Sequence, residues 1–234
     1  MDSLKPGGLG VVVGATGGIG EAMVEALRQS GAFADIIGFS RVSAPDLDLT
    51  DEQTILRAAA AVRDTGLDLR LVFDATGFLH GCGFQPEKAL SAIDPAHMAH
   101  AFAVNAIGPA LLMKHFLPLM PREGKSIFAT LSAKVGSIGD NRLGGWYSYR
   151  ASKAALNQLV HSAAIELARK RPEALCVALH PGTVDTGLSS GFAKGGLTVR
   201  TAADAAPLLL GVLDRLEPSD TGGFFDYNGD ALPW

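Results

Sequence analysis

Charged residues and cysteines are scarce in this chain of 234 residues. Only 19% of the residues are charged and only two are cysteines, Cys82 and Cys176, against 47% that are hydrophobic. Such a composition excludes an intrinsically disordered chain, and two cysteines far apart in the sequence predict free thiols in place of a disulfide framework. The six histidines show no metal-ligand spacing. We therefore expect no metal site.

Basic residues and long apolar runs are also lacking. The net charge is −4 and the pI is near 5.8, which removes the electrostatic case for binding nucleic acid. No uninterrupted apolar run approaches the about 18 residues of a membrane span, and residues 1–10 lack the basic-then-apolar order of a signal peptide. These absences predict a cytoplasmic protein with no membrane or nucleic-acid partner.

The length and the order of segments predict one α/β domain over residues 1–234. Strand-like runs occur at residues 9–13, 36–39, 69–73, 126–131 and 175–179, and helix-like runs lie near 18–30, 51–65, 96–120, 148–170 and 201–216. This alternation is typical of a Rossmann-type, doubly wound parallel sheet, here of about seven strands, with helices on both faces. Such sheets bind ligands at the carboxyl ends of their strands.

A glycine-rich turn follows the first predicted strand. Residues 14–20 read Gly-Ala-Thr-Gly-Gly-Ile-Gly and lead into a helix-like segment. Glycines permit a tight turn and a close approach of backbone to ligand, while unsatisfied N–H groups of the helix face an anion. The alternative is a glycine turn without a ligand. We interpret the turn as a dinucleotide phosphate site that is formed by Gly14, Thr16, Gly17, Gly18, Ile19 and Gly20.

A second informative stretch, residues 149–153, reads Tyr-Arg-Ala-Ser-Lys at the predicted start of a helix. Residues four apart share a helix face, so the ammonium group of Lys153 stands beside the phenol of Tyr149. A neighbouring cation favours the phenolate, which predicts a lowered pKa for Tyr149 and proton transfer near neutral pH. Taken alone, such a pair is more often an amphipathic tyrosine beside a solvated lysine.

Together the two motifs resemble those of the short-chain dehydrogenase/reductase family, and the resemblance covers essentially the whole chain. Residues 74–77 read Asp-Ala-Thr-Gly where the family usually has Asn-Asn-Ala-Gly, Asn105 matches its helix asparagine, and residues 181–186 match its Pro-Gly loop. More narrowly, residues 135–149 and 223–234 look like the C-signal-factor and sniffer-type carbonyl reductases. The resemblance implies a homodimer or homotetramer that forms through the helices near 96–120 and 148–170.

The resemblance also implies reduction of a carbonyl by a nicotinamide cofactor. Tyr149 gives the carbonyl oxygen a proton, and Lys153 lowers the tyrosine pKa and binds the ribose. Asn105 positions a water and a helix kink, with a helix-capping or buried structural amide as the alternative. Further cofactor contacts that the family implies are Ala75, Thr76, Gly77, Pro181, Gly182, Val184 and Thr186.

The end of the second strand bears on the choice of cofactor. It reads Gly-Phe-Ser-Arg at residues 38–41, and no acid stands at this tip because Asp35 is placed before the strand. A carboxylate there holds the ribose hydroxyls of NAD, whereas an arginine accommodates the 2′-phosphate of NADP. Ser40 and Arg41 therefore favour NADP(H), with NAD(H) as the alternative cofactor and an ordinary surface arginine as the alternative interpretation.

The resemblance assigns the adenine end of the cofactor to residues 48 and 49. Asp48, followed by Leu49, matches the family aspartate that contacts the adenine amino group. The alternative for Asp48 is an N-cap or dipole partner for the helix that starts near Asp51.

The catalytic serine is where this chain departs from the family pattern. The family usually shows Ser-Ser-x-x-Gly with the second serine catalytic, whereas residues 131–136 here read Leu-Ser-Ala-Lys-Val-Gly. Counting back from Gly136 places Ala133 at the catalytic position, and counting forward from the strand places Ser132 there. Ser137 is a weaker third candidate. We assign the oxyanion contact to Ser132. Losing one such donor costs about 10²–10³ in rate, and the other catalytic residues of the family pattern are present in this chain.

Several large apolar residues flank the predicted site. Trp146, Leu143, Phe78 and Phe192 favour a small apolar or aromatic carbonyl or alcohol as substrate, and each is equally consistent with ordinary packing. Residues 187–198 are rich in small residues, which suits either a modest lid over the substrate or a surface crossover.

Two other function classes remain open. The first is a cofactor-binding signalling or regulatory protein with little or no turnover. The second is an epimerase or dehydratase, which needs a larger C-terminal substrate domain than the remaining residues provide. Retention of Asn105, Tyr149 and Lys153 favours a working reductase, since a pure binder needs no phenolic acid.

Overall fold

Six parallel strands form the main sheet of the part of the chain that this computed structural model describes, residues 1–188 and 198–234. They are β1 (Gly8–Val13), β2 (Phe33–Phe39), β3 (Leu69–Asp74), β4 (Ser126–Leu131), β5 (Ala174–His180) and β8 (Phe224–Asp226). Their order across the sheet is β2-β1-β3-β4-β5-β8. The connections change direction between β1 and β3, where a doubly wound sheet opens a crevice for ligands.

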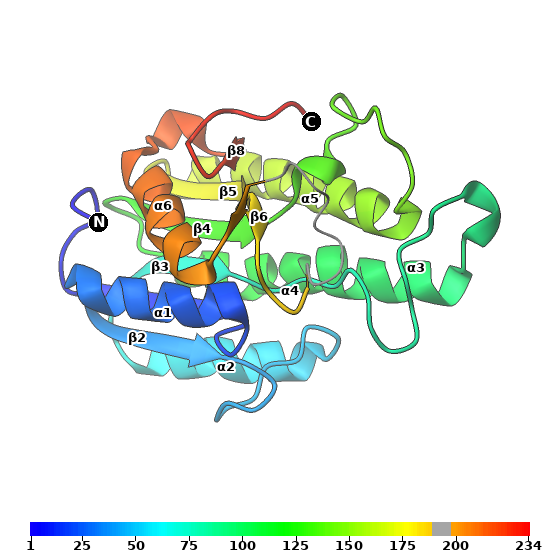
Figure 1. Cartoon of the computed structure of the whole chain (residues 1–234). Coiled ribbons are helices and arrows are strands. Elements are labelled where there is room, and N and C mark those ends of the chain that lie inside the picture. The colour runs from blue at the N-terminus through cyan, green and yellow to red at the C-terminus, as the bar shows by residue number, and fades with distance from the viewer. Residues whose placement is uncertain (189–197) are drawn as a thin grey trace.

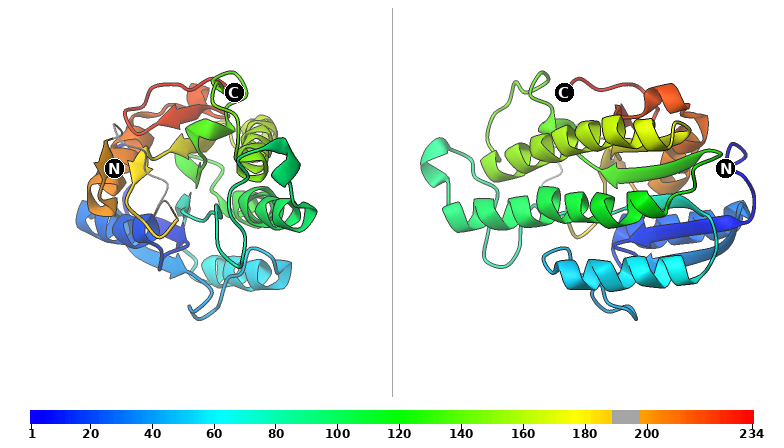
Figure 2. Two further views of the ribbon diagram at one scale, coloured as in Figure 1. Left: turned by 45° about the vertical axis from the view of Figure 1, so that its right-hand side comes forward. Right: turned by 180° about the vertical axis from the view of Figure 1, so that it is seen from behind.

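Helices cover both faces of this sheet. The helices are α1 (Gly18–Ser30), α2 (Glu52–Asp64), α3 (Pro95–Phe102), α4 (Gly108–Phe116), α5 (Tyr147–Lys170) and α6 (Ala202–Arg215). Figure 1 shows α1 and α6 on one face, and the reverse view in Figure 2 shows α2, α4 and α5 on the other. Short 3-10 turns occur at Leu90–Ala92, Leu117–Leu119, Lys134–Gly136 and Pro218–Asp220.

Burial of the strands on both faces explains their continuous apolar runs. Every residue of β1, β3 and β4 is buried. Successive side chains point to opposite faces, so Val11 and Val13 of β1 pack with α2, α4 and α5, while Val12 packs with α1 and α6. The two cores meet only through the sheet, which holds the carboxyl ends of its strands along one edge.

The observed fold confirms the predicted class. The main sheet has six strands against the about seven expected for a doubly wound fold. Two further strands of the described residues, β6 (Thr183–Val184) and β7 (Val199–Arg200), pair with each other in a separate sheet. The second strand was predicted to begin after Asp35. It begins at Phe33 and contains Asp35, because its first residues pair with β1 although their side chains are exposed or half-buried.

The segment predicted as one helix over 96–120 is continuous but irregular. A π-helical turn, Ala103–Ile107, joins α3 to α4. Pro109 has no N–H and cannot donate to the carbonyl of Asn105 four residues earlier, which accounts for the irregularity. By length and composition alone residues 95–119 could span a membrane, and 44% of the apolar window is buried in the fold.

Candidate active site

The predicted site motifs lie at one edge of the sheet. Val13 pairs with Phe39 and with Asp74, Asp74 pairs with Thr130, and the next strand pair aligns Leu131 with Leu179. The loops that leave these strands therefore start side by side. They carry the glycine-rich turn, residues 74–77, the serine segment and the Pro-Gly loop.

The glycine-rich turn is built for close backbone contacts. Gly14 has a left-handed φ of 81°, and a Cβ on Gly20 would lie 2.0 Å from the Gly14 carbonyl oxygen. Helix α1 has no side-chain N-cap, since Gly17 occupies that position. Its first N–H groups are therefore available to an anion. This cradle fits the pyrophosphate of a dinucleotide.

The Pro-Gly loop, residues 181–186, lies next to the glycine-rich turn. A Cβ on Gly18 would lie 3.0 Å from Thr186, so residues 183–186 pass directly beside the start of α1. Val184 is buried, and Gly182 has a φ of 79° with the ring of Tyr227 against it. Most of the predicted lid, including Phe192, lies outside the described residues.

Tyr149 and Lys153 lie in the first two turns of α5, and both are buried. The Lys153 Nζ is 6.0 Å from the centre of the Tyr149 ring. It donates a hydrogen bond to the Leu131 carbonyl at 2.8 Å, which ties α5 to the end of β4. Gly136 lets the turn after β4 pack closely against Lys153, because a Cβ on residue 136 would lie only 2.7 Å from the Lys153 Cβ. The structure thus brings the predicted phenol and ammonium to one face of the helix.

The ionisation of the pair differs from the sequence prediction. Burial raises the pKa of the Tyr149 phenol above its ordinary value, whereas the spacing predicted a lowered pKa. Burial also lowers the pKa of Lys153 to about 8, and the Asp74 carboxylate opposes that shift. Desolvation is the cause of the raised pKa of Tyr149. Tyr149 is therefore a protonated phenol, which is the form that donates a proton.

Asp74 is a buried group whose contacts the sequence did not predict. It accepts hydrogen bonds from the Thr76 N–H at 3.0 Å, from the Thr76 hydroxyl at 2.5 Å and from the Thr130 hydroxyl at 2.7 Å. Burial raises the pKa of Asp74, while these hydrogen bonds and Lys153 act in the opposite direction. The sequence did contain a signal for these contacts, since Asp74 replaces the asparagine that is usual in the family. A buried carboxylate needs hydrogen-bond donors from neighbouring residues, and Thr76 and Thr130 provide them.

Asn105 connects the loop after β3 to the start of α5. Its amide donates to the Phe78 carbonyl at 2.7 Å and to the Ser152 hydroxyl at 3.0 Å, and its Oδ1 accepts from the Phe78 N–H at 2.7 Å. The side chain therefore has a structural role. Asn105 lies within the π-helical turn, and its backbone carbonyl receives no hydrogen bond from Pro109.

The serine segment places the three candidate residues differently. The Ser132 hydroxyl donates to Asn157 Oδ1 at 2.6 Å, deep against α5. Ala133 instead shares a buried apolar cluster with Tyr149 and Leu79. Ser137 binds the carbonyl of Trp234 and the N–H of Asp140. Ala133 is thus the candidate whose side chain belongs to the apolar cluster of Tyr149, whereas both serine hydroxyls have polar partners.

The apolar wall beside Tyr149 differs in part from the predicted one. Trp146 meets the Tyr149 ring edge-on at 6.2 Å between centroids. Leu79, Val135 and Leu188, which the sequence did not single out, complete the cluster. Phe78 packs against His97 and His100 of α3 instead, and Leu143 is 80% exposed. Side-chain direction after a strand ends depends on the loop path, which no local pattern encodes.

The residues assigned to the adenosine end lie beside the tip of β2. Ser40 is buried and its hydroxyl accepts the Val42 N–H, while Arg41 is exposed. The pKa of Asp48 is lowered by hydrogen bonds from the Thr50 hydroxyl and N–H, and further by the charge of Arg41. Asp48 is not the N-cap of α2; Asp51 is.

Leu49 lies against Gly108, where a Cβ on the glycine would meet the leucine Cβ at 2.6 Å. This contact seats the loop after β2 on the start of α4. Within residues 1–188 and 198–234, no group of three His, Cys, Asp or Glu side chains is arranged to hold a metal ion.

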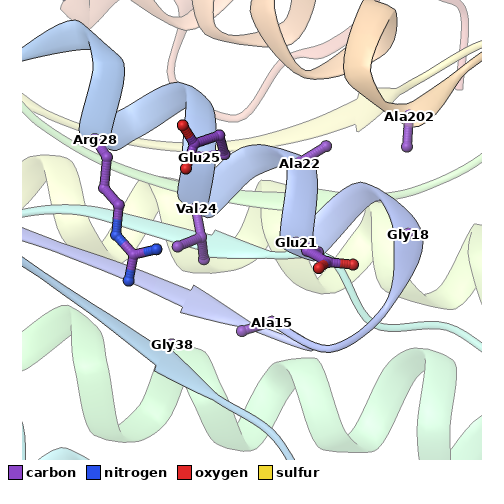
Figure 3. A pocket seen from close by; sticks show the side chains of 9 residues that line it. All are labelled: Ala15, Gly18, Glu21, Ala22, Val24, Glu25, Arg28, Gly38 and Ala202. Atoms are coloured by element: carbon purple, nitrogen blue, oxygen red, sulfur yellow. The ribbon is translucent and has the colours of Figure 1, made fainter.

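A surface hollow of about 740 Å³ runs along α1 and is shown in Figure 3. It reaches the glycine-rich turn at Ala15 and Gly18, and the side chains of Glu21, Glu25 and Arg28 line it. Tyr149 and Lys153 do not belong to it. The hollow therefore approaches the phosphate cradle from outside and is separate from the proton-transfer pair.

Comparisons with known proteins show the family of this chain. Residues 14–212 match the family model described as enoyl-(acyl carrier protein) reductase. The chain is 39% identical over 147 residues to C-signal of Myxococcus xanthus, covering 62% of this chain and 84% of that protein. It is 30% identical over 233 residues to 1-hydroxy-2-glutathionyl-2-methyl-3-butene dehydrogenase of Rhodococcus sp. (strain AD45), covering 96% and 98% of the two chains.

Solved structures share the fold along nearly the whole chain. The NADPH-bound carbonyl reductase from chicken fatty liver has a TM-score of 0.83 and 26% identity, covering 99% of this chain and all of that one. Carbonyl reductase Sniffer of D. melanogaster has a TM-score of 0.83 at 23% identity, covering 98% and 100%, and shows the fold alone. With the family match extending over residues 14–212, this chain belongs to the short-chain dehydrogenase/reductase family of oxidoreductases, and C-signal is among its relatives.

Proposed function

We propose that this oxidoreductase uses NADP(H) to interconvert small apolar or aromatic carbonyl compounds and their alcohols. The observation that carries the proposal is the buried Tyr149 phenol, which lies on an apolar wall with Lys153 one helical turn away. A proton donor in water-poor surroundings suits addition of hydride to a carbonyl, where negative charge develops on oxygen. The bound nicotinamide supplies the hydride.

The proton route follows from the contacts of the chain. The Tyr149 phenol donates its proton to the substrate oxygen; its raised pKa keeps the phenol protonated across the neutral range and also makes it a weaker acid. Lys153 is held between the Leu131 carbonyl and the charge of Asp74. We assign it to the ribose and to the return of a proton to Tyr149, since a pKa of about 8 permits exchange near neutral pH.

The oxyanion contact needs a separate proposal. The assignment to Ser132 stays a prediction, but its hydroxyl is already bound to Asn157. We propose that Ala133 occupies the catalytic-serine position, so that Tyr149 alone among these residues donates to the substrate oxygen. Slow turnover, or a substrate that needs little oxyanion stabilisation, would follow.

NADP(H) is favoured by the tip of β2. Arg41 is exposed beside the assigned adenosine end, and its charge reaches Asp48. An exposed guanidinium is suited to a 2′-phosphate, because its planar fork matches phosphate oxygens. Relatives of similar fold have been crystallised with NADPH or NADP, which supports the choice without excluding NAD(H).

Arg41→Ala is expected to raise the KM for NADPH by about 10- to 100-fold, the loss of a charge-assisted hydrogen bond, and to leave the KM for NADH nearly unchanged. Steady-state kinetics with both cofactors measures this. Arg57→Ala is the matched control, because Arg57 is an exposed arginine of α2 that pairs with Asp46. Equal changes for NADPH and NADH in Arg41→Ala would contradict the assignment.

The experiment that tests the function is cofactor oxidation against a panel of aromatic aldehydes, quinones, diketones and aliphatic ketones. NADPH and NADH are run in parallel. Turnover with NADPH on apolar carbonyls supports the proposal, and its absence on every carbonyl contradicts it.

A regulatory protein with little turnover is the second candidate. Two observations favour it: the 39% identity to C-signal over 147 residues and the position of Ala133 beside Tyr149. It predicts tight NADPH binding, no turnover, and a biological activity that survives replacement of Tyr149. A cytoplasmic location stays a prediction for either candidate.

We also propose a homodimer or homotetramer. Helices α4 and α5 form an outward hollow lined by apolar groups that include Met113, Leu117, Leu159 and Ala163. Ile165 on α5 is 49% exposed. Sedimentation equilibrium is expected to give at least two copies of the 24.3 kDa chain, and a monomer at all concentrations would contradict this.

A further inference from the structure

A buried carboxylate from a distant loop holds the start of helix α5. Glu87 lies in the segment between β3 and α3, and its side chain is 2% exposed. It accepts hydrogen bonds from the Ser148 hydroxyl and, at 3.2 Å, from the Ser148 N–H. Its backbone carbonyl accepts the Trp146 N–H at 2.5 Å. One residue therefore binds three donors in the turn that precedes Tyr149.

Helix α5 lacks the usual local means of starting. Its N-cap residue, Trp146, makes no side-chain cap hydrogen bond, and its first turn contains no acid. Unsatisfied N–H groups at a helix start need acceptors, and a carboxylate there also interacts favourably with the helix dipole. Glu87, 61 residues before Ser148, provides both the acceptor for the Ser148 N–H and the negative charge at the helix start.

The entry into α5 is also strained. Gly144, Gly145 and Trp146 have left-handed φ values of 63°, 67° and 52°. A tryptophan in this region is uncommon, and such a conformation persists only when surrounding contacts hold it. Glu87 contacts the strained residue itself, through the Trp146 N–H, and also contacts Ser148 two residues later.

Glu87 is itself held in place. His97 Nδ1 lies 3.3 Å from its Oε1, and both side chains are buried. The His97 ring stacks on Phe84 with 5.0 Å between centroids and lies edge-on to Phe78. The pKa of Glu87 is lowered, because hydrogen bonds from Ser148 and from backbone N–H groups outweigh the effect of burial.

We infer that Glu87 is a positioning residue for the proton donor, setting the first turn of α5 so that Tyr149 faces the apolar wall. Leu79, from the same loop, and Trp146 both pack with Tyr149. Residues 78–94 therefore contact the site in two ways. Leu79 packs in the apolar cluster of Tyr149, and Glu87 caps the start of α5. The inference rests on the proposed function for its kinetic consequence.

The test is Glu87→Gln, which keeps the shape of the side chain and removes its charge. We expect kcat for carbonyl reduction to fall by about 10- to 100-fold, as for a small misplacement of a reacting group. The NADPH dissociation constant should remain within about twofold, because the cradle at α1 is untouched. Glu87→Asp, which keeps the charge on a shorter stem, is expected to recover part of kcat.

Glu173→Gln is the matched control. Glu173 follows the opposite end of α5, is exposed, and accepts the Gly124 N–H at 2.9 Å, a carboxylate-to-backbone contact far from Tyr149. It should leave kcat unchanged. If Glu87→Gln lowers kcat only in proportion to its loss of folded protein, or not at all, the inference is wrong.

Amide hydrogen exchange separates this inference from the proposed function. In Glu87→Gln, exchange at residues 148–151 should accelerate by at least about tenfold while the middle of α5 is unaffected, since the cap acts locally. Ser148→Ala provides a second test should Glu87→Gln not fold. A wild type without turnover contradicts the function alone, whereas unchanged exchange in the variant contradicts the cap.

Discussion

Tyr149→Phe is expected to lower kcat for carbonyl reduction by about 10²–10⁴-fold, the range that a positioned general acid contributes. The phenol is the buried proton donor of the site, and burial keeps it protonated. Phenylalanine fills the same space without a donor. Because no charge or buried hydrogen-bond network is lost, folding and NADPH affinity should remain close to those of the wild type.

Tyr147→Phe is the matched control for this variant. Tyr147 is the first residue of α5 and is only partly buried. Losing its hydroxyl should leave kcat unchanged. Single-turnover kinetics with saturating NADPH measures the chemical step directly. Retention of most activity in Tyr149→Phe, or an equal loss in Tyr147→Phe, would remove Tyr149 as the proton donor.

Ala133→Ser is expected to raise kcat by up to about 10²–10³-fold, which is the cost of one missing oxyanion donor. Ala133 packs beside Tyr149 at the end of β4, and a serine adds one hydroxyl at that position. Ser132→Ala is expected to change kcat little, since the Ser132 hydroxyl is bound to Asn157. Its effect should fall on stability, at about 1–3 kcal/mol for leaving Asn157 without that partner.

The two serine variants also decide between the opposing assignments. Steady-state kinetics and thermal unfolding are measured on both, with the double variant to test additivity. A loss of about 10²–10³-fold in kcat of Ser132→Ala at unchanged stability would return the oxyanion contact to Ser132. An inactive wild type that gains turnover in Ala133→Ser would connect the regulatory candidate to this single position.

Contiguous patterns were sufficient for much of the fold and for the main motifs. The strand, glycine-rich turn and helix over residues 9–30 are local in sequence, so their order alone predicts a phosphate cradle. Tyr149 and Lys153 are one helical turn apart, so a helix is enough to bring them together. Their ionisation did not follow, because the spacing carries no information on burial.

The tertiary structure alone decided which side chains face the site. Ser132 and Ala133 are adjacent, and only the turn after β4 directs one toward Asn157 and the other toward Tyr149. The path of the loop after β3 likewise directs Phe78 toward His100 of α3 and away from Tyr149. The cap of α5 comes from Glu87, 61 residues before Ser148. Local sequence therefore determined the elements and the pairs within them, while contacts between distant segments, which depend on how the loops pack, determined burial, orientation and support.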